Sequence, residues 1–130
     1  MSQSQAAPSG SERRRSARLD HIVPLKLSSG DIEIVTETSN LSSSGVYCRV
    51  NSYIEPMTKL KIHLLLPVKK NNRISTKRIS CQGVVVRTES VPNEDFFNAA
   101  IFFNDIQPKD IRSLADFVEQ MLEESKPSKV

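Results

Sequence analysis

The sequence predicts a mainly β domain in which about six antiparallel strands form a small barrel, followed by one amphipathic α-helix. Apolar side chains recur at every second position in several short stretches, as expected of strands with one buried face. Glycine, proline, asparagine and serine separate these stretches and favour turns. Near Pro108 the apolar spacing changes to three and four residues, which is typical of a helix packed on a core. A chain of 130 residues has room for one such domain.

The strand predictions follow the alternation along the chain. In the first stretch Leu25 and Leu27 share one face, whereas Pro24 favours an edge position or an irregular start. The stretch 67–77 is basic, and we expect a loop or a solvated hairpin tip there, with contact to a partner or to a membrane surface as the less favoured alternative. Gly83 interrupts a long strand and predicts a bulge or a bend. The expected strands are 21–28, 32–38, 45–50, 59–66, 78–89 and 96–103.

The helix is expected near the C-terminus, where Pro108 suits a first helical turn. Its apolar stripe comprises Ile111, Leu114, Ala115, Val118, Met121 and Leu122. The polar N-terminal segment is expected to be disordered because it offers little apolar surface to bury. The predicted division of the chain is a disordered tail at 1–12, an arginine arm at 13–19, the barrel at 20–104, the helix at 108–124 and a C-terminal tail at 125–130.

The formal net charge of +3 is concentrated at the N-terminus. Residues 1–18 contain four arginines and a single acid, whereas the remaining residues contain fourteen basic and fourteen acidic side chains. A neutral body with a basic arm favours an anionic partner that the arm holds.

Several functional classes receive no support from the sequence. No apolar run is long enough to span a bilayer, and no apolar signal segment is present, so we expect a cytoplasmic protein without a membrane span. Cys48 and Cys81 lie in apolar stretches without nearby metal-ligand partners, and we expect buried free thiols and no metal site. Neither a serine–histidine–carboxylate set nor a pair of carboxylates stands out, so we expect a binding module and not an enzyme.

Two polar motifs, separated by one expected hairpin, carry the functional prediction. The first is an RxxxR pair, Arg14 and Arg18, within a cluster that also contains Arg13 and Arg15. The second is an NxSxxG motif formed by Asn40, Ser42 and Gly45. Taken singly, an arginine run is usually a solvated tail and a polar stretch is usually a turn. Their order and separation make the pair specific.

The two motifs together resemble the signature of the PilZ domain family, which accepts Asp or Asn at the first position of the second motif. The resemblance runs from about Glu12 to the helix, with the PilZ domain expected at 13–124, and includes a GxVVR stretch that begins at Gly83. It implies a six-stranded antiparallel β-barrel with a C-terminal α-helix, and a bacterial receptor for bis-(3′,5′)-cyclic dimeric GMP (cyclic di-GMP). One departure is the stretch 98–102, where family members often carry a glycine.

The residue types suit that ligand. Arginine grips phosphate oxygens with a planar fork of donors and stacks on flat π systems, and a cyclic dinucleotide offers both groups. Asn40 and Ser42 supply donors and acceptors for a guanine edge. Gly45 is expected to allow close approach of the backbone to the ligand, with a φ that other residues avoid. We therefore expect Arg13, Arg14, Arg15, Arg18, Asn40, Ser42 and Gly45 to bind the ligand.

The resemblance also implies a mechanism and a stoichiometry. Ligand binding is expected to order the arginine arm onto the barrel, and a downstream protein, not identified by the sequence, would read the new surface. The output would be motility, pili, exopolysaccharide or transcription. Family members with a basic residue at the position of Arg13 tend to bind an intercalated ligand dimer, which implies two cyclic di-GMP molecules per chain.

Two alternatives stay open. A small barrel that binds single-stranded nucleic acid would use aromatic platforms beside basic grooves, and only Tyr47 and Tyr53 lie in the middle of the chain. The phenylalanines lie mainly in the last expected strand and are predicted to be core, so DNA or RNA is not the expected partner. A PilZ-like protein-interaction adaptor that no longer binds nucleotide is the other alternative, and the intact motifs argue against it.

Overall fold

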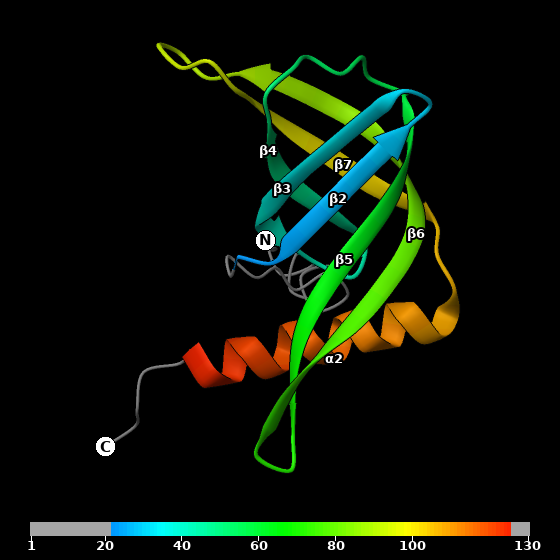
Figure 1. Cartoon of the computed structure of the whole chain (residues 1–130), viewed down its shortest axis with the longest axis vertical. Helices are drawn as coiled ribbons and strands as arrows, with labels where there is room; N and C mark the ends of the chain where they lie inside the picture. The colour runs from blue at the N-terminus through cyan, green and yellow to red at the C-terminus, as the bar shows by residue number, and fades with distance from the viewer. Residues whose placement is uncertain (1–21, 126–130) are drawn as a thin grey trace, which may run out of the picture.

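Within residues 22–125, six antiparallel strands close into a barrel in the order β2-β3-β4-β7-β6-β5, and one helix lies beside it (Figure 1). The computed structural model describes residues 22–125, so the predictions for the tails and the arginine arm lie outside the described residues. The mainly β class and the single C-terminal helix are confirmed. The elements are β2 (Pro24–Ser29), β3 (Ile32–Leu41), β4 (Gly45–Val50), β5 (Lys59–Lys70), β6 (Arg73–Ser90), β7 (Phe97–Asp105) and α2 (Pro108–Ser125).

The pairing of β2 with β5 closes the barrel and builds the core. Leu25 lies opposite Leu64, and Leu27 lies opposite Ile62; all four side chains are buried. Pro24 is the first residue of β2, a position that suits a residue without a backbone N–H. The alternation predicted from the sequence is therefore the alternation of buried and exposed positions around the ring.

The β5–β6 hairpin is longer than predicted. The stretch 67–77, expected as a loop or tip, continues both strands as far as the pair Lys70 and Arg73. Asn71 and Asn72 connect the strands with φ of 53° and 64°, the left-handed conformation that a two-residue hairpin turn favours. Residues 69–78 are all exposed, and a strand without a buried face shows no apolar period.

The β6–β7 register shifts between Gln82 and Gly83, where the sequence predicted a bulge or a bend. The extra residue is Asn104 of the partner strand β7, because Gln82 lies opposite Asp105 and Gly83 lies opposite Phe103. A Cβ at Gly83 would lie 2.5 Å from the Cδ1 of Ile62 and 2.8 Å from the Cγ2 of Ile101, so only glycine fits there without repacking. A second shift lies between Val85 and Arg87 and leaves Val86 unpaired in the β6–β7 ladder.

Helix α2 begins where predicted and lies beneath the barrel in the view of Figure 1. The carbonyl of Gln107 accepts bonds from the backbone N–H groups of Asp110 (2.9 Å) and Ile111 (3.0 Å), which starts the helix. The face toward the core is formed by Leu114, Phe117 and Val118, all buried. Phe117 was missing from the predicted stripe, whereas Ile111, which was included, is 38% exposed.

Candidate functional site

The NxSxxG motif forms the sharp connection between β3 and β4. Asn40 belongs to β3 and Gly45 begins β4, so the expected polar loop is shorter than 40–45. The backbone N–H of Ser42 donates to the carbonyl of Gly45 at 3.0 Å, and the N–H of Phe103 donates to the carbonyl of Ser44 at 3.0 Å. These bonds fix the loop to itself and to β7, which gives a rigid base for a binding site.

Ser42 is fully buried, and its hydroxyl shapes the loop. Its Oγ accepts a bond from the backbone N–H of Ser44 at 3.2 Å and lies 3.1 Å from the Oγ of Ser44. The same hydroxyl lies 3.4 Å from the carbonyl oxygen of Gly45, to which it can donate. A serine side chain that bonds the backbone two residues later stabilises a tight turn. The predicted contact between Ser42 and a ligand stays a prediction.

Gly45 is required for a reason other than the one expected. Among the described glycines only Gly30 has a positive φ, so the expected special φ at Gly45 is wrong. A Cβ at Gly45 would instead lie 2.5 Å from the carbonyl oxygen of Ile101 in the neighbouring strand β7. The close backbone approach therefore occurs between two strands of the barrel.

A bulge in β3 determines which way Asn40 faces. Thr38 lies opposite Cys48 and is buried, and the register then shifts so that Asn40 lies opposite Tyr47. Regular alternation would have placed both Thr38 and Asn40 on the core side. The extra residue, Ser39, reverses this and leaves Asn40 half-buried on the outer side of the sheet.

The register continues this outer row across four strands. Asn40 lies opposite Tyr47, Tyr47 opposite Ala100, and Ala100 opposite Arg87. Directly opposed residues share a face, so the row joins the motif residue to an aromatic ring and a guanidinium. The motif is therefore one end of a polar band on the outer face of β3, β4, β7 and β6.

Tyr47, Arg87 and Glu89 form a contact cluster within this band. The hydroxyl of Tyr47 donates to the Oε1 of Glu89 at 2.9 Å, and the Nε of Arg87 lies 3.1 Å from the Oε2 of Glu89. The guanidinium carbon of Arg87 lies 5.9 Å from the centre of the Tyr47 ring, within cation–π range. The hydrogen bond with Tyr47 and the charge of Glu89 raise the pKa of Arg87, which stays a cation.

An apolar hollow of about 230 Å³ lies directly beside the loop. Phe102 and Val86, on its lining, are 49% and 52% exposed. The expectation that the phenylalanines of the last strand are core is therefore wrong for Phe102, although Phe103 is buried. Exposed apolar side chains beside polar ones suit a planar ligand that has an apolar face and a polar edge. The hollow is lined by Ser44, Gly45, Val46, Val86, Ile101 and Phe102.

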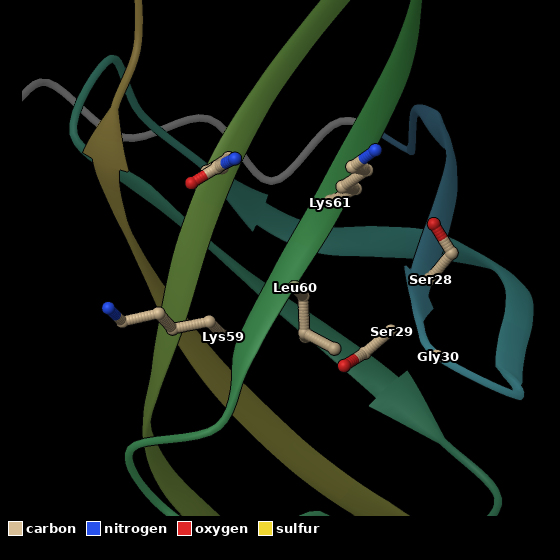
Figure 2. Close-up of a pocket in the computed structure, with 7 residues that line it drawn as sticks. Ser28, Ser29, Gly30, Lys59, Leu60 and Lys61 are labelled. Atoms are coloured by element: carbon tan, nitrogen blue, oxygen red, sulfur yellow. The ribbon is translucent and has the colours of Figure 1, made fainter.

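A larger hollow, of about 450 Å³, lies at the opposite end of β3, beside the β2–β3 turn (Figure 2). Lys59, Lys61 and Gln82 contribute to its wall, together with Ser28 and Ser29. Figure 2 shows the amine ends of Lys59 and Lys61 pointing in different directions, so they do not converge on one anion. This hollow has the volume of a ligand site without its convergent chemistry.

The two cysteines are buried, as expected. Burial raises the pKa of the Cys48 thiol to about 12. Burial, followed by the charges of Asp110 and Asp105, raises the pKa of the Cys81 thiol to about 12. Both are protonated at neutral pH and therefore poor nucleophiles and metal ligands. Within residues 22–125 no helix is long and apolar enough to cross a membrane, and no three metal-ligating side chains gather.

The structure locates the second motif but not the first. Asn40, Ser42 and Gly45 lie together, whereas Arg13, Arg14, Arg15 and Arg18 lie outside the described residues. Sequence reasoning did not include Tyr47, Arg87 or Glu89 in the site. The pairing across β4, β7 and β6 joins residues that are about forty positions apart, which no local pattern reveals. The sequence signal that could have pointed to this part of the site was Arg87, at the end of the GxVVR stretch.

Comparison with known proteins identifies the family. The PilZ domain model matches residues 12–120, and the chain belongs to the PilZ domain family. None of the curated proteins matches the chain. The expected fold, a PilZ-type barrel with a C-terminal helix, is thereby confirmed.

Solved structures of PilZ proteins share this fold at low sequence identity. The inhibitor of motility MotI/DgrA from Bacillus subtilis matches with a TM-score of 0.77 and 19% identity, over 88% of this chain and 54% of that one. YcgR from Escherichia coli, solved in complex with c-di-GMP, matches with a TM-score of 0.65 and 12% identity, over 87% and 47%. The PilZ domain of YcgR with c-di-GMP matches at 0.60 and 9% identity, over 87% and 94%. The chain spans about half the length of the first two.

Proposed function

We propose that this protein is a receptor for cyclic di-GMP, and that the ligand binds on the outer barrel face beside the β3–β4 loop. The observation that carries the proposal is the bulge at Ser39, which places Asn40 of the NxSxxG motif in one row with Tyr47 and Arg87. This arrangement occurs in a chain of the PilZ family, and the solved structures with this fold include proteins bound to c-di-GMP.

Each part of the ligand meets suitable chemistry on this face. The side-chain amide of Asn40 can bond a guanine edge with its donor and its acceptor. The guanidinium of Arg87 and the arginines of the arm can grip phosphate oxygens through paired N–H groups. The ring of Tyr47 and the exposed side chain of Phe102 offer apolar surfaces to a purine face. The loop residues Ser42 and Gly45 hold this arrangement in place.

The signal passes through the arm in this account. Ligand binding clamps Arg14 and Arg18 onto the barrel, and another protein reads the resulting surface; Arg15 adds a phosphate or stacking contact. The protein acts as a receptor and adaptor and not as an enzyme. We place it in the cytoplasm, where the buried thiols Cys48 and Cys81 stay reduced.

The proposal includes a stoichiometry of two ligand molecules per chain. A second dinucleotide brings two further phosphates and another guanine face. The guanidinium of Arg13 can neutralise a phosphate and stack on the guanine face. Equilibrium dialysis on the wild type and on Arg13→Leu tests this. A ratio near one in the wild type, or the same ratio in both proteins, contradicts it.

Calorimetric titration with cyclic di-GMP tests the receptor function itself. Arg14→Ala, Arg18→Ala and Asn40→Ala should each weaken binding by about 1.5–3 kcal/mol, the scale of a hydrogen bond to a charged group. Arg112→Ala, on the exposed surface of α2, serves as the matched charge control and should bind as the wild type does.

The alternatives define the other outcomes of the titration. Saturable binding of single-stranded RNA without binding of the cyclic dinucleotide would establish the nucleic-acid barrel. Binding of neither would establish the adaptor without ligand. Binding of cyclic di-GMP that neither arginine variant nor Asn40→Ala weakens would reject the proposed site.

A further inference from the structure

The outer part of the β5–β6 hairpin pairs with no third strand. β2 pairs with β5 only as far as Leu64, and β7 pairs with β6 only from Gln82 onward. Residues 65–78 therefore form a two-stranded ribbon that is not needed to close the barrel. Leu66 is buried and Val68 packs against the core, which fixes the base of the ribbon. Beyond this base no side chain is buried, so packing on the core does not explain why the hairpin extends so far.

We call residues 69–78 the hairpin tip; all ten are exposed, and in Figure 1 the tip extends past α2. It contains five basic residues and no acid, whereas the other described residues contain seven basic and thirteen acidic side chains. Among the described residues the tip is thus a basic projection on a body of the opposite sign, which favours contact between the tip and an anionic surface. The basic residues are Lys69, Lys70, Arg73, Lys77 and Arg78.

The pairing within the tip brings like charges together. Lys70 lies directly opposite Arg73 beside the turn. Side chains at opposed positions on one sheet face are close neighbours, and like charges there repel each other. No ion pair between residues 22 and 125 joins a tip cation to an acid. An external anionic surface would relieve this repulsion.

Ile74 distinguishes between the possible anionic surfaces. It is 74% exposed, and it lies opposite Lys69 on the face of the ribbon that Lys70 and Arg73 do not share. A nucleic-acid backbone would satisfy the cations but leave this side chain in water. The surface of an anionic bilayer can bind both the cations and the isoleucine side chain. The basic groups contact the headgroups, while the apolar side chain enters the headgroup–acyl boundary.

We propose that the hairpin tip binds the surface of a bilayer that contains anionic lipids, with Ile74 inserted at the level of the headgroups. This contact is peripheral and involves no spanning segment. It leaves the outer face of β3, β4, β7 and β6 open, so it does not depend on the proposed receptor function.

Cosedimentation of the full chain with lipid vesicles tests the proposal. The vesicles contain phosphatidylcholine with a substantial fraction of phosphatidylglycerol, and vesicles of phosphatidylcholine alone serve as the reference. Each surface Lys or Arg contributes roughly a five-fold factor to partitioning onto an anionic membrane, so Lys69→Gln with Lys70→Gln should reduce partitioning about twenty-five-fold. Lys59→Gln with Lys61→Gln removes the same charge from exposed barrel positions of the same strand and should change it less than three-fold.

A second pair of variants tests the apolar part. Ile74→Ser should reduce partitioning about five-fold, because a transferred aliphatic side chain is lost. Val35→Ser is the matched control, since Val35 is 78% exposed on the barrel, and it should have little effect. All these positions are exposed, so circular dichroism is expected to confirm that each variant is folded.

The arginine arm is intact in every variant, so its contribution cancels in these comparisons. Equal partitioning of the two lysine double variants would overturn the proposal, as would equal binding to both kinds of vesicle. Binding to a DNA duplex that Lys69→Gln with Lys70→Gln weakens, without binding to the vesicles, would overturn it in favour of nucleic acid.

Discussion

The β3–β4 loop and the hairpin tip both connect neighbouring antiparallel strands, yet their residues are held in opposite ways. In the loop, Ser42 is fully buried and hydrogen-bonded to Ser44 and Gly45. In the tip, residues 69–78 are all exposed, and the turn asparagines, Asn71 and Asn72, adopt positive φ. The loop therefore has one well-defined arrangement, whereas only the pairing of the two strands orders the tip.

This difference indicates where a substitution acts. A change in the loop alters the barrel itself, because the loop is bonded to β7 through the carbonyl of Ser44. A change at the tip alters surface charge and leaves the core intact. Loss of binding by a loop variant must therefore be separated from loss of folding, whereas tip variants allow a direct comparison of binding.

The largest effect is expected at Gly45. Gly45→Ala places a Cβ 2.5 Å from the carbonyl oxygen of Ile101, and the backbone of β7 can move only by distorting the barrel. We expect the free energy of unfolding to fall by about 2–4 kcal/mol in urea denaturation. Gly30→Ala is the control: that glycine has open space around it but a φ of +56°, so about 1 kcal/mol is expected. Equal losses in both variants would contradict the close-approach explanation.

The next largest effect is expected in the pH dependence of stability, and it comes from Cys48, which lies on β4 close to the loop. The thiol loses its proton near pH 9 in the unfolded chain and only near pH 12 in the folded one. Between these values the unfolded state binds fewer protons, so stability falls as pH rises, by up to about 1.4 kcal/mol per pH unit.

Urea denaturation at a series of alkaline pH values checks this, with Cys48→Ala for comparison. The variant is expected to be less stable at neutral pH, because a buried side chain is truncated, but to lose stability less steeply above pH 9. Parallel curves for the wild type and the variant would show that Cys48 ionises equally in both states.

A smaller effect is expected from the hydroxyl of Ser42. Ser42→Ala removes the acceptor of the Ser44 backbone N–H while keeping the buried Cβ, and should lower the free energy of unfolding by about 1–2 kcal/mol. Ser43→Ala, in the same loop, is the control and should stay within about 0.5 kcal/mol. If Ser42→Ala is as stable as the wild type but binds cyclic di-GMP more weakly, the hydroxyl contacts the ligand and does not mainly shape the loop.

The smallest effect on stability is expected at the tip. Lys69→Gln with Lys70→Gln should change the free energy of unfolding by less than about 0.5 kcal/mol, and the change should be stabilising because Lys70 no longer repels Arg73. The gain should decrease at high salt, which screens surface charges. A loss of more than 1 kcal/mol would mean that the tip lysines pack on the protein.

The sequence predicts those parts of the fold in which a strand has one buried and one exposed face. The alternation in β2 and β5 is read directly, because Leu25, Leu27 and Leu64 fill the core every second residue. The same rule fails for the hairpin tip, because none of its residues, 69–78, is buried. It also fails for Phe102, since a fully apolar stretch does not reveal which of its aromatic residues faces outward.

The sequence predicts the motif of the candidate site but not the geometry in which its residues are arranged. Spacing identifies Asn40, Ser42 and Gly45, but the bulge at Ser39 that turns Asn40 outward has no sequence signal. Arg87 joins the same band only through the register of β6 on β7. Long-range pairing of this kind depends on the closed barrel as a whole.

Mapping of amide chemical shifts during titration with cyclic di-GMP tests whether the ligand binds on the outer barrel face, because it reports on the β3–β4 loop and the hairpin tip at once. Binding on this face predicts saturable changes concentrated in residues 40–49 and 87–89, with the amides of the hairpin tip unchanged. In the Asn40→Ala variant the same changes should require higher ligand concentrations, while its spectrum without ligand shows an intact barrel. Changes concentrated at the hairpin tip or around the hollow at Lys59 and Lys61, or no changes at all, would contradict the account.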